Sequence, residues 1–137
     1  GVDGYIYFHE IGQDDGSTNP YSPIEAYIES GPIEIGEGEQ FGFAWRMIPD
    51  LDFRNSSAAN PTVDFILEAQ DYSGSNFSQS VNNDTTLTAT IPVAQFTEQT
   101  YFRIRGRMLS LKVRSTDLGV AWRLGIPRID VRSDGRR

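Results

Sequence analysis

The 137 residues carry a formal net charge of −7 and contain no cysteine. The length suits one domain with a core of its own, and the lack of cysteine excludes disulfide bonds and thiolate metal sites. No segment approaches the roughly 18–20 apolar residues of a membrane helix, so no membrane partner is expected, and the acidic balance disfavours nucleic acid as a partner for the whole surface. Because the chain begins with Gly1 rather than Met, we expect a processed chain or a piece of a longer protein.

The first 23 residues are expected to form a separate N-terminal strand and a linker. Tyr5–Ile11 has the aromatic and β-branched composition of a short strand. Gly12–Pro23 is rich in turn-forming residues and is therefore expected to be a loop. Residues 24–137 are then expected to fold as one β-domain.

The middle of the chain reads as a series of short strands. In Gln40–Ile48, large apolar residues alternate with smaller or polar ones, and we expect Phe43 and Trp45 to face the core. The other expected strands are Ile24–Ser30, Ile33–Ile35, Leu51–Arg54, Thr62–Gln70 and Thr85–Ile91. The polar segment Asp71–Asp84 is expected to be a long loop.

The last 37 residues show the clearest strand alternation. The alternation changes phase after Met108, so we expect a bulge or a strand break near Arg107–Leu109. Ser115–Gly119 is rich in turn formers, and the apolar positions that follow it predict the return arm of a hairpin.

These patterns predict an all-β fold. No stretch of ten residues has helical spacing, and about eight to ten short strands indicate an antiparallel two-sheet β-sandwich, jelly-roll-like or immunoglobulin-like. The expected core residues are Phe43, Trp45, Phe65, Leu111 and Trp122.

Charge is divided unequally along the chain. Residues 101–137 hold ten basic and three acidic residues, a local charge of +7, whereas residues 1–100 hold two basic and sixteen acidic residues, a local charge of −14. Arg103, Arg105 and Arg107 form one row on a strand, for which three interpretations remain open. The row is a solvated outer face, it pairs with acids on a neighbouring strand, or it meets the acidic half of an adjacent copy.

Little in the sequence indicates catalysis. His9 is the single histidine, and a structural role suits it better than a triad or a metal site, because such sites need several converging groups. Asp14 and Asp15 lack the spacing of an EF-hand and fit a solvated turn. We therefore expect no enzyme activity, no cofactor and no metal, although a glycosidase-type pair of carboxylates drawn from distant strands stays open.

The chain resembles a known family in three segments. Glu29–Ile48, Gln95–Arg107 and Gly119–Arg137 resemble the C-terminal region of tail stabilisation or nozzle proteins of short-tailed bacteriophages (podoviruses), and the similarity runs from about Tyr5 to Arg137. These segments are sequence habits of the family and carry no chemical motif.

The resemblance implies a structural role in the virion tail. Members are longer, with a β-propeller-type body, and assemble as a ring, typically of six, that continues the DNA channel below the tail adaptor. Tyr5–Ile11 would then end the preceding body, and genomic DNA would pass without sequence-specific binding. No catalytic residues are implied. The interface candidates, from the charge pattern, are Arg103, Arg105, Arg107 and Arg128.

Other functions remain as alternatives. A carbohydrate- or host-receptor-binding module on the same sandwich would need exposed aromatic platforms, for which Trp45 and Trp122 are the candidates. A glycan hydrolase would need two carboxylates facing a groove. A nucleic-acid binder ranks last, because Tyr101 is the one stacking aromatic expected on the basic strand.

Overall fold

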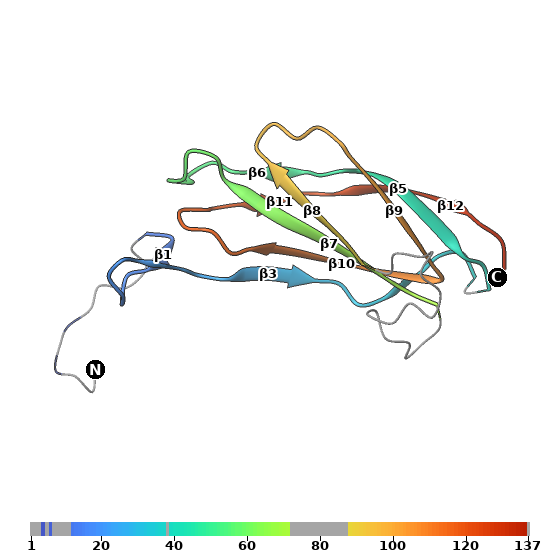
Figure 1. Ribbon diagram of the computed structural model, residues 1–137, viewed down its shortest axis with the longest axis horizontal. Coiled ribbons are helices and arrows are strands. Elements are labelled where there is room, and N and C mark those ends of the chain that lie inside the picture. Colours follow the sequence, from blue (N-terminus) through green and yellow to red (C-terminus); the bar gives the residue numbers. More distant parts are fainter. Residues whose placement is uncertain (1–3, 5, 7–11, 38, 72–87, 137) are drawn as a thin grey trace.

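The computed structural model is described for residues 4, 6, 12–37, 39–71 and 88–136, and this part of the chain consists of strands and loops without a helix (Figure 1). The strands are β1 (Asp14–Asp15), β2 (Ser22–Pro23), β3 (Ala26–Glu29), β4 (Ile33–Glu34), β5 (Gly42–Ile48), β6 (Leu51–Asp52), β7 (Thr62–Gln70), β8 (Thr88–Ala94), β9 (Thr100–Gly106), β10 (Met108–Ser115), β11 (Arg123–Leu124) and β12 (Arg128–Ser133). The expected strand at Tyr5–Ile11, with His9, and the expected loop at Asp71–Asp84 lie outside the described residues, apart from Ile6 and Asp71.

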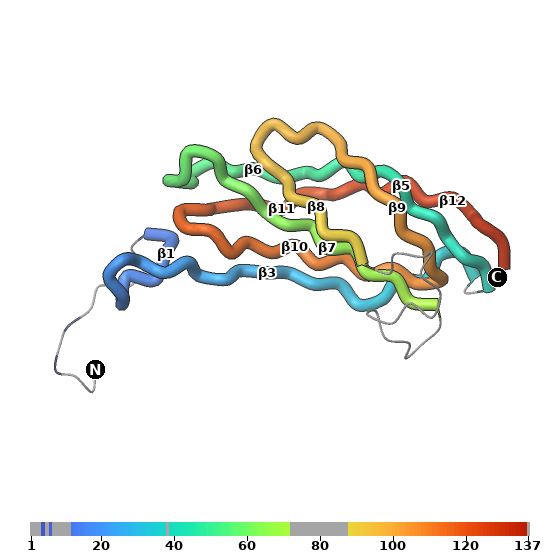
Figure 2. Tube along the Cα trace, in the orientation of Figure 1, coloured from blue at the N-terminus to red at the C-terminus, as the bar shows by residue number. Residues whose placement is uncertain are grey.

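Two antiparallel sheets make up the body. The larger sheet has the strand order β3-β10-β7-β8, and β4 also pairs with β10. The smaller sheet has the order β12-β5-β9, and the short β6–β11 ladder extends it, because β6 follows β5 and β11 precedes β12. The body is elongated, with β1 near one end and the end of β12 near the other (Figure 2). The prediction of an all-β, sandwich-like fold is confirmed.

The core lies between the two sheets, and β7 forms its centre. Val63, Phe65, Leu67 and Ala69 alternate inward along this strand and are at most 1% exposed, as their spacing predicts. The rest of the core comes from both sheets: Ala44, Met47, Phe53, Ile91, Val93, Ile104, Leu109 and Val113. Leu111 and Trp122, two expected core residues, are half-buried and pack against this cluster.

The expected strand break falls at Arg107. β9 ends at Gly106 in the smaller sheet, and β10 begins at Met108 in the larger one, so the phase change marks the place where the chain crosses between sheets. A Cβ atom at position 106 would lie 2.7 Å from the Cβ of Ala69. Glycine at this position therefore permits the close approach of the two backbones.

The expected hairpin after β10 is wrong. β11 pairs with β6 in the other layer and not with β10. The turn after β10 is hydrogen-bonded to a loop that precedes β7. The amides of Ser57 and Ala58 both donate to the carbonyl of Gly119, at 2.9 and 3.0 Å. These bonds, together with a φ of 73° at Gly119, carry the chain across to the smaller sheet.

The expected inward orientation of Phe43 and Trp45 is also wrong. The inward residues of β5 are Gly42, Ala44 and Met47, with an irregularity in the pairing to β9 between Ala44 and Arg46. A side chain at position 42 would collide with Ile35, so the small residues of β5 must face the core. The two aromatic rings consequently lie half-buried on the outer face of the smaller sheet.

The segment expected to be a linker contacts the sandwich. β1 and β2 pair with each other within it, through Asp14 with Pro23 and Asp15 with Ser22. A carboxylate oxygen of Asp14 accepts a hydrogen bond of 2.8 Å from the amide of Gly119. The β1–β2 pair is therefore bound to the loop that connects β10 in the larger sheet to β11.

Candidate binding surfaces

Two of the four candidate interface arginines are engaged within the chain. The Nε of Arg105 donates to a carboxylate oxygen of Asp134 at 2.6 Å, and its guanidinium lies 4.0 Å from the ring centre of Phe41. The guanidinium of Arg107 lies 5.0 Å from the same ring. Arg105 therefore pairs with an acid of the same domain, as one interpretation expects, although Asp134 follows β12, the next strand but one from β9.

The other two candidates face solvent at different places. Arg103 is exposed on the outer face of β9, beside the two rings of β5, and Arg128 is exposed at the start of β12. The structure thus separates the four arginines, and they do not form one interface.

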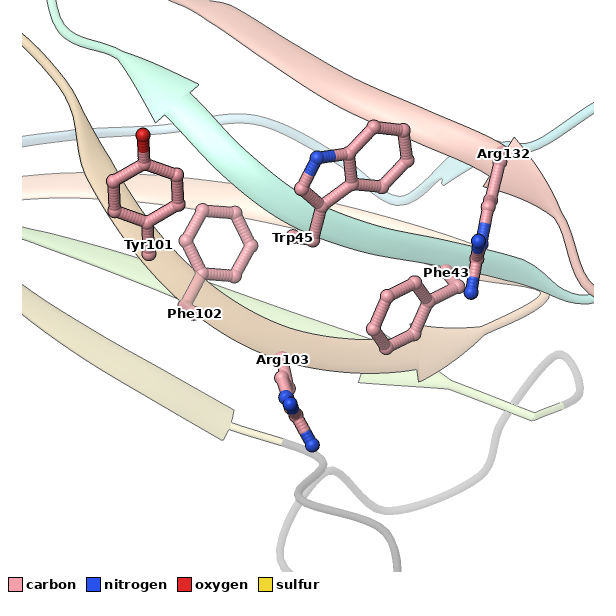
Figure 3. Close-up of a pocket in the computed structure, with 6 residues that line it drawn as sticks. All are labelled: Phe43, Trp45, Tyr101, Phe102, Arg103 and Arg132. Atoms are coloured by element: carbon pink, nitrogen blue, oxygen red, sulfur yellow. The ribbon is translucent and has the colours of Figure 1, made fainter.

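Aromatic and basic side chains gather on the outer face of the smaller sheet. We call this surface the arginine–aromatic face, and its outward members are Phe43, Trp45, Tyr101, Arg103 and Arg132. Figure 3 shows them around a shallow hollow of about 530 Å³, which Phe102 also lines although it packs against the core cluster. They come from β5, β9 and β12, which bring together residues far apart in the sequence. Tyr101 is 68% exposed, so the face is open to solvent.

The rings of this face are stacked. The ring centres of Phe43 and Trp45 lie 6.3 Å apart with an angle of 13° between their planes. The guanidinium of Arg132 lies 5.1 Å from the centre of the first ring and 5.8 Å from the second. This is the geometry of cation–π contact, and it holds a positive charge beside a flat aromatic surface.

A second candidate surface lies along one side of the sandwich. The larger sheet is one strand wider than the smaller one, so β3 and β4 extend past β12. The uncovered strip is an apolar groove of about 290 Å³ that continues as a second hollow beside β11, and we call the two together the open-edge groove. Its main apolar members are Ile28, Ile33, Ile35, Leu109, Leu111, Leu124, Ile129 and Val131. On the opposite side β8 packs against β9, and residues 95–99 join these two strands (Figure 1).

The two borders of the open-edge groove carry opposite charges. An acidic lip of exposed residues follows β3 and β4, namely Glu25, Glu29 and Glu34. A basic lip of exposed residues follows β11 and the start of β12, namely Arg123 and Arg128. Ile28 and Ile33 lie on the acidic side and are 55% and 63% exposed, although the β10 residues paired with them, Val113 and Leu109, are buried in the core.

Metal-ligating side chains do not gather in the part of the chain that the structure describes. Those residues contain no group of three or more histidine, cysteine, aspartate or glutamate side chains placed to hold a metal ion. They also contain no helix long and apolar enough to cross a membrane.

The sequence indicated only part of these two surfaces. The sequence pattern favours a core role for Trp45 over an exposed one, and it gives no reason to select Arg132. The alternation of Gly42 and Ala44 with the aromatic residues was the available signal, because small residues commonly face a tightly packed layer. The open-edge groove depends on strand order, which the sequence pattern does not specify.

Comparison with known proteins adds no assignment. The sequence matches no protein-family model, and a search of curated proteins finds no match.

Proposed function

We propose that this chain is a non-catalytic structural module of a short-tailed bacteriophage tail, from the nozzle or stabilisation protein. In this proposal its work is assembly with further copies of itself into a ring that continues the DNA channel. The three resembling segments support the family, and the open-edge groove supports the role in assembly.

The observation that carries the role in assembly is an uncovered strip of core-type residues. Apolar side chains exposed to water at a sandwich edge are unfavourable for the free protein. Open edge strands also have unpaired backbone groups that can pair with another chain. Ile28 and Ile33 remain more than half exposed within the chain. Covering them with a second copy would remove this apolar surface from water and occupy the edges of β3 and β12 at the same time.

The charged lips specify how two copies meet. An acidic lip and a basic lip on the same side allow the acidic lip of one copy to face the basic lip of the next. Complementary charges of this kind fix orientation and partner choice more than they add affinity. If each copy uses its acidic lip for one neighbour and its basic lip for the other, the contact is heterologous, which is the type of contact that builds rings.

The remaining parts of the proposal come from the resemblance. The ring has six copies, sits in the virion tail, and contacts the tail adaptor and other tail proteins. Its acidic surface, from a chain of net charge −7, would keep passing genomic DNA from adhering, because carboxylates repel phosphates.

The proposal is tested by mass photometry of the full chain across salt concentration, followed by negative-stain imaging. A closed ring at low salt that shifts toward smaller species as salt rises is expected, because salt screens the contact between the lips. A protein that stays monomeric at every salt concentration, also at high protein concentration, would contradict assembly through this edge.

A further inference from the structure

The arginine–aromatic face lies apart from the open-edge groove and has the features of a ligand site of its own. Its hollow of about 530 Å³ falls within the size range of small-molecule sites. Three elements far apart in the sequence supply its walls, with rings from β5 and β9 and arginines from β9 and β12 (Figure 3). Neither the assembly proposal nor the core uses the rings of Phe43 and Trp45.

Two positive charges at this face are not neutralised by the described residues. Arg46 pairs with Asp130, and Arg105 pairs with Asp134, so these two neighbours bring no net charge. Arg103 and Arg132 have no ion pair with any residue of the described ranges. The face is thus locally positive on a chain whose net charge is −7.

We propose that the arginine–aromatic face binds an acidic carbohydrate, a chain of sugar units bearing carboxylates. The flat rings of Phe43 and Trp45 offer a platform for the apolar face of a sugar ring. Stacking would remove the apolar surfaces of both the protein and the sugar from water. The guanidinium groups of Arg103 and Arg132 match a carboxylate, because their planar donors can form two parallel hydrogen bonds with it. The exposed hydroxyl of Tyr101 is placed to bond with a sugar hydroxyl.

The small number of available charges favours an acidic sugar over a nucleic acid. Tight binding of a polyphosphate depends on a series of basic residues along its path. Here two arginines are available, and the arginines beside them are already paired with aspartates. Two available charges beside an aromatic platform therefore fit a short acidic sugar better than the path of a polyphosphate.

The test is calorimetric titration of the full chain with a hexamer of galacturonic acid, with a neutral glucose hexamer and with a thymidine oligonucleotide. We expect binding of the acidic sugar, and a loss of about tenfold or more in affinity for Trp45→Ala and for Arg132→Gln. Tyr101→Phe is a milder variant that removes one hydroxyl and is expected to weaken binding by a smaller factor. Because these side chains lie on the outer face, the circular dichroism spectrum should be preserved.

Tyr27→Ala is the matched control. Tyr27 is 60% exposed, and the ammonium of Lys112 lies 4.5 Å from its ring centre, so this variant also removes an aromatic–cation contact, on the other sheet. It should leave the affinity unchanged. The proposal is overturned if the acidic sugar does not bind, if the neutral sugar or the oligonucleotide binds as tightly, or if Trp45→Ala and Arg132→Gln bind as the unsubstituted protein does.

Discussion

Replacing Phe65 by alanine is expected to lower the free energy of unfolding by about 3–5 kcal/mol, the range for truncating a large buried aromatic residue. Phe65 is 0% exposed and lies between Val113 of β10 and Ile91 of β8 in the larger sheet. The substitution leaves a cavity that the neighbouring strands cannot fill, because β7 is paired on both sides. Chemical denaturation followed by fluorescence measures the change.

The control for this prediction is Phe96→Ala. Phe96 is 88% exposed in the connection from β8 to β9, so its truncation removes the same atoms without opening a cavity. It should change stability by no more than about 0.5 kcal/mol. A loss below about 1 kcal/mol for Phe65→Ala would contradict the placement of Phe65 at the centre of the core.

Replacing Ile33 by lysine is expected to reduce self-association by about tenfold or more. Ile33 lines the open-edge groove and is 63% exposed, so the isolated fold should tolerate the change. In the assembly the lysine would place a charge in an apolar contact, beside the acidic lip and against the basic lip of the next copy. Mass photometry against protein concentration measures the shift toward monomer.

Phe96→Lys is the matched control for the assembly. It replaces an exposed apolar residue by the same charge on the opposite side of the sandwich. Unchanged association for this variant, together with a loss for Ile33→Lys, would locate the contact at the open edge. Equal effects of both variants would indicate a response to net charge alone and would contradict the proposed interface.

Ile33→Lys should still bind the acidic sugar, because Ile33 lies outside the arginine–aromatic face.

Local alternation predicted the strands best where a strand is paired on both sides. β7 begins and ends as expected, and its inward residues follow from a period of two, since one face meets the core without interruption. The break at Arg107 was also predictable, because the change of phase after Met108 leaves a trace in the sequence. Both features are determined by residues close together in the chain.

The two wrong predictions, the inward face of β5 and the hairpin after β10, concern features that depend on contacts between residues far apart in the sequence. Which face of β5 turns inward depends on Ile35, which leaves no room for a side chain at Gly42, and the alternation alone does not contain this contact. The missed hairpin depends on the bonds from Ser57 and Ala58 to Gly119, some sixty residues away along the chain. For the same reason, the distribution of charge was visible in the sequence, whereas the pairing of Arg105 with Asp134 and the two lips were not.

The most direct test of assembly through the open edge uses the absence of native cysteine. Two singly substituted proteins, Glu34→Cys in the acidic lip and Arg128→Cys in the basic lip, are mixed and oxidised, and the disulfide-linked dimers are separated by mass. Both positions are exposed, so the substitutions should not disturb the fold. Phe96→Cys, on the opposite side, serves as the reference partner.

Contact between the lips predicts that the mixed Glu34→Cys and Arg128→Cys dimer forms well above its statistical share, and that neither protein is enriched in dimers with Phe96→Cys. Disulfides in statistical proportions among all three proteins would show that the lips do not meet, and would contradict the account.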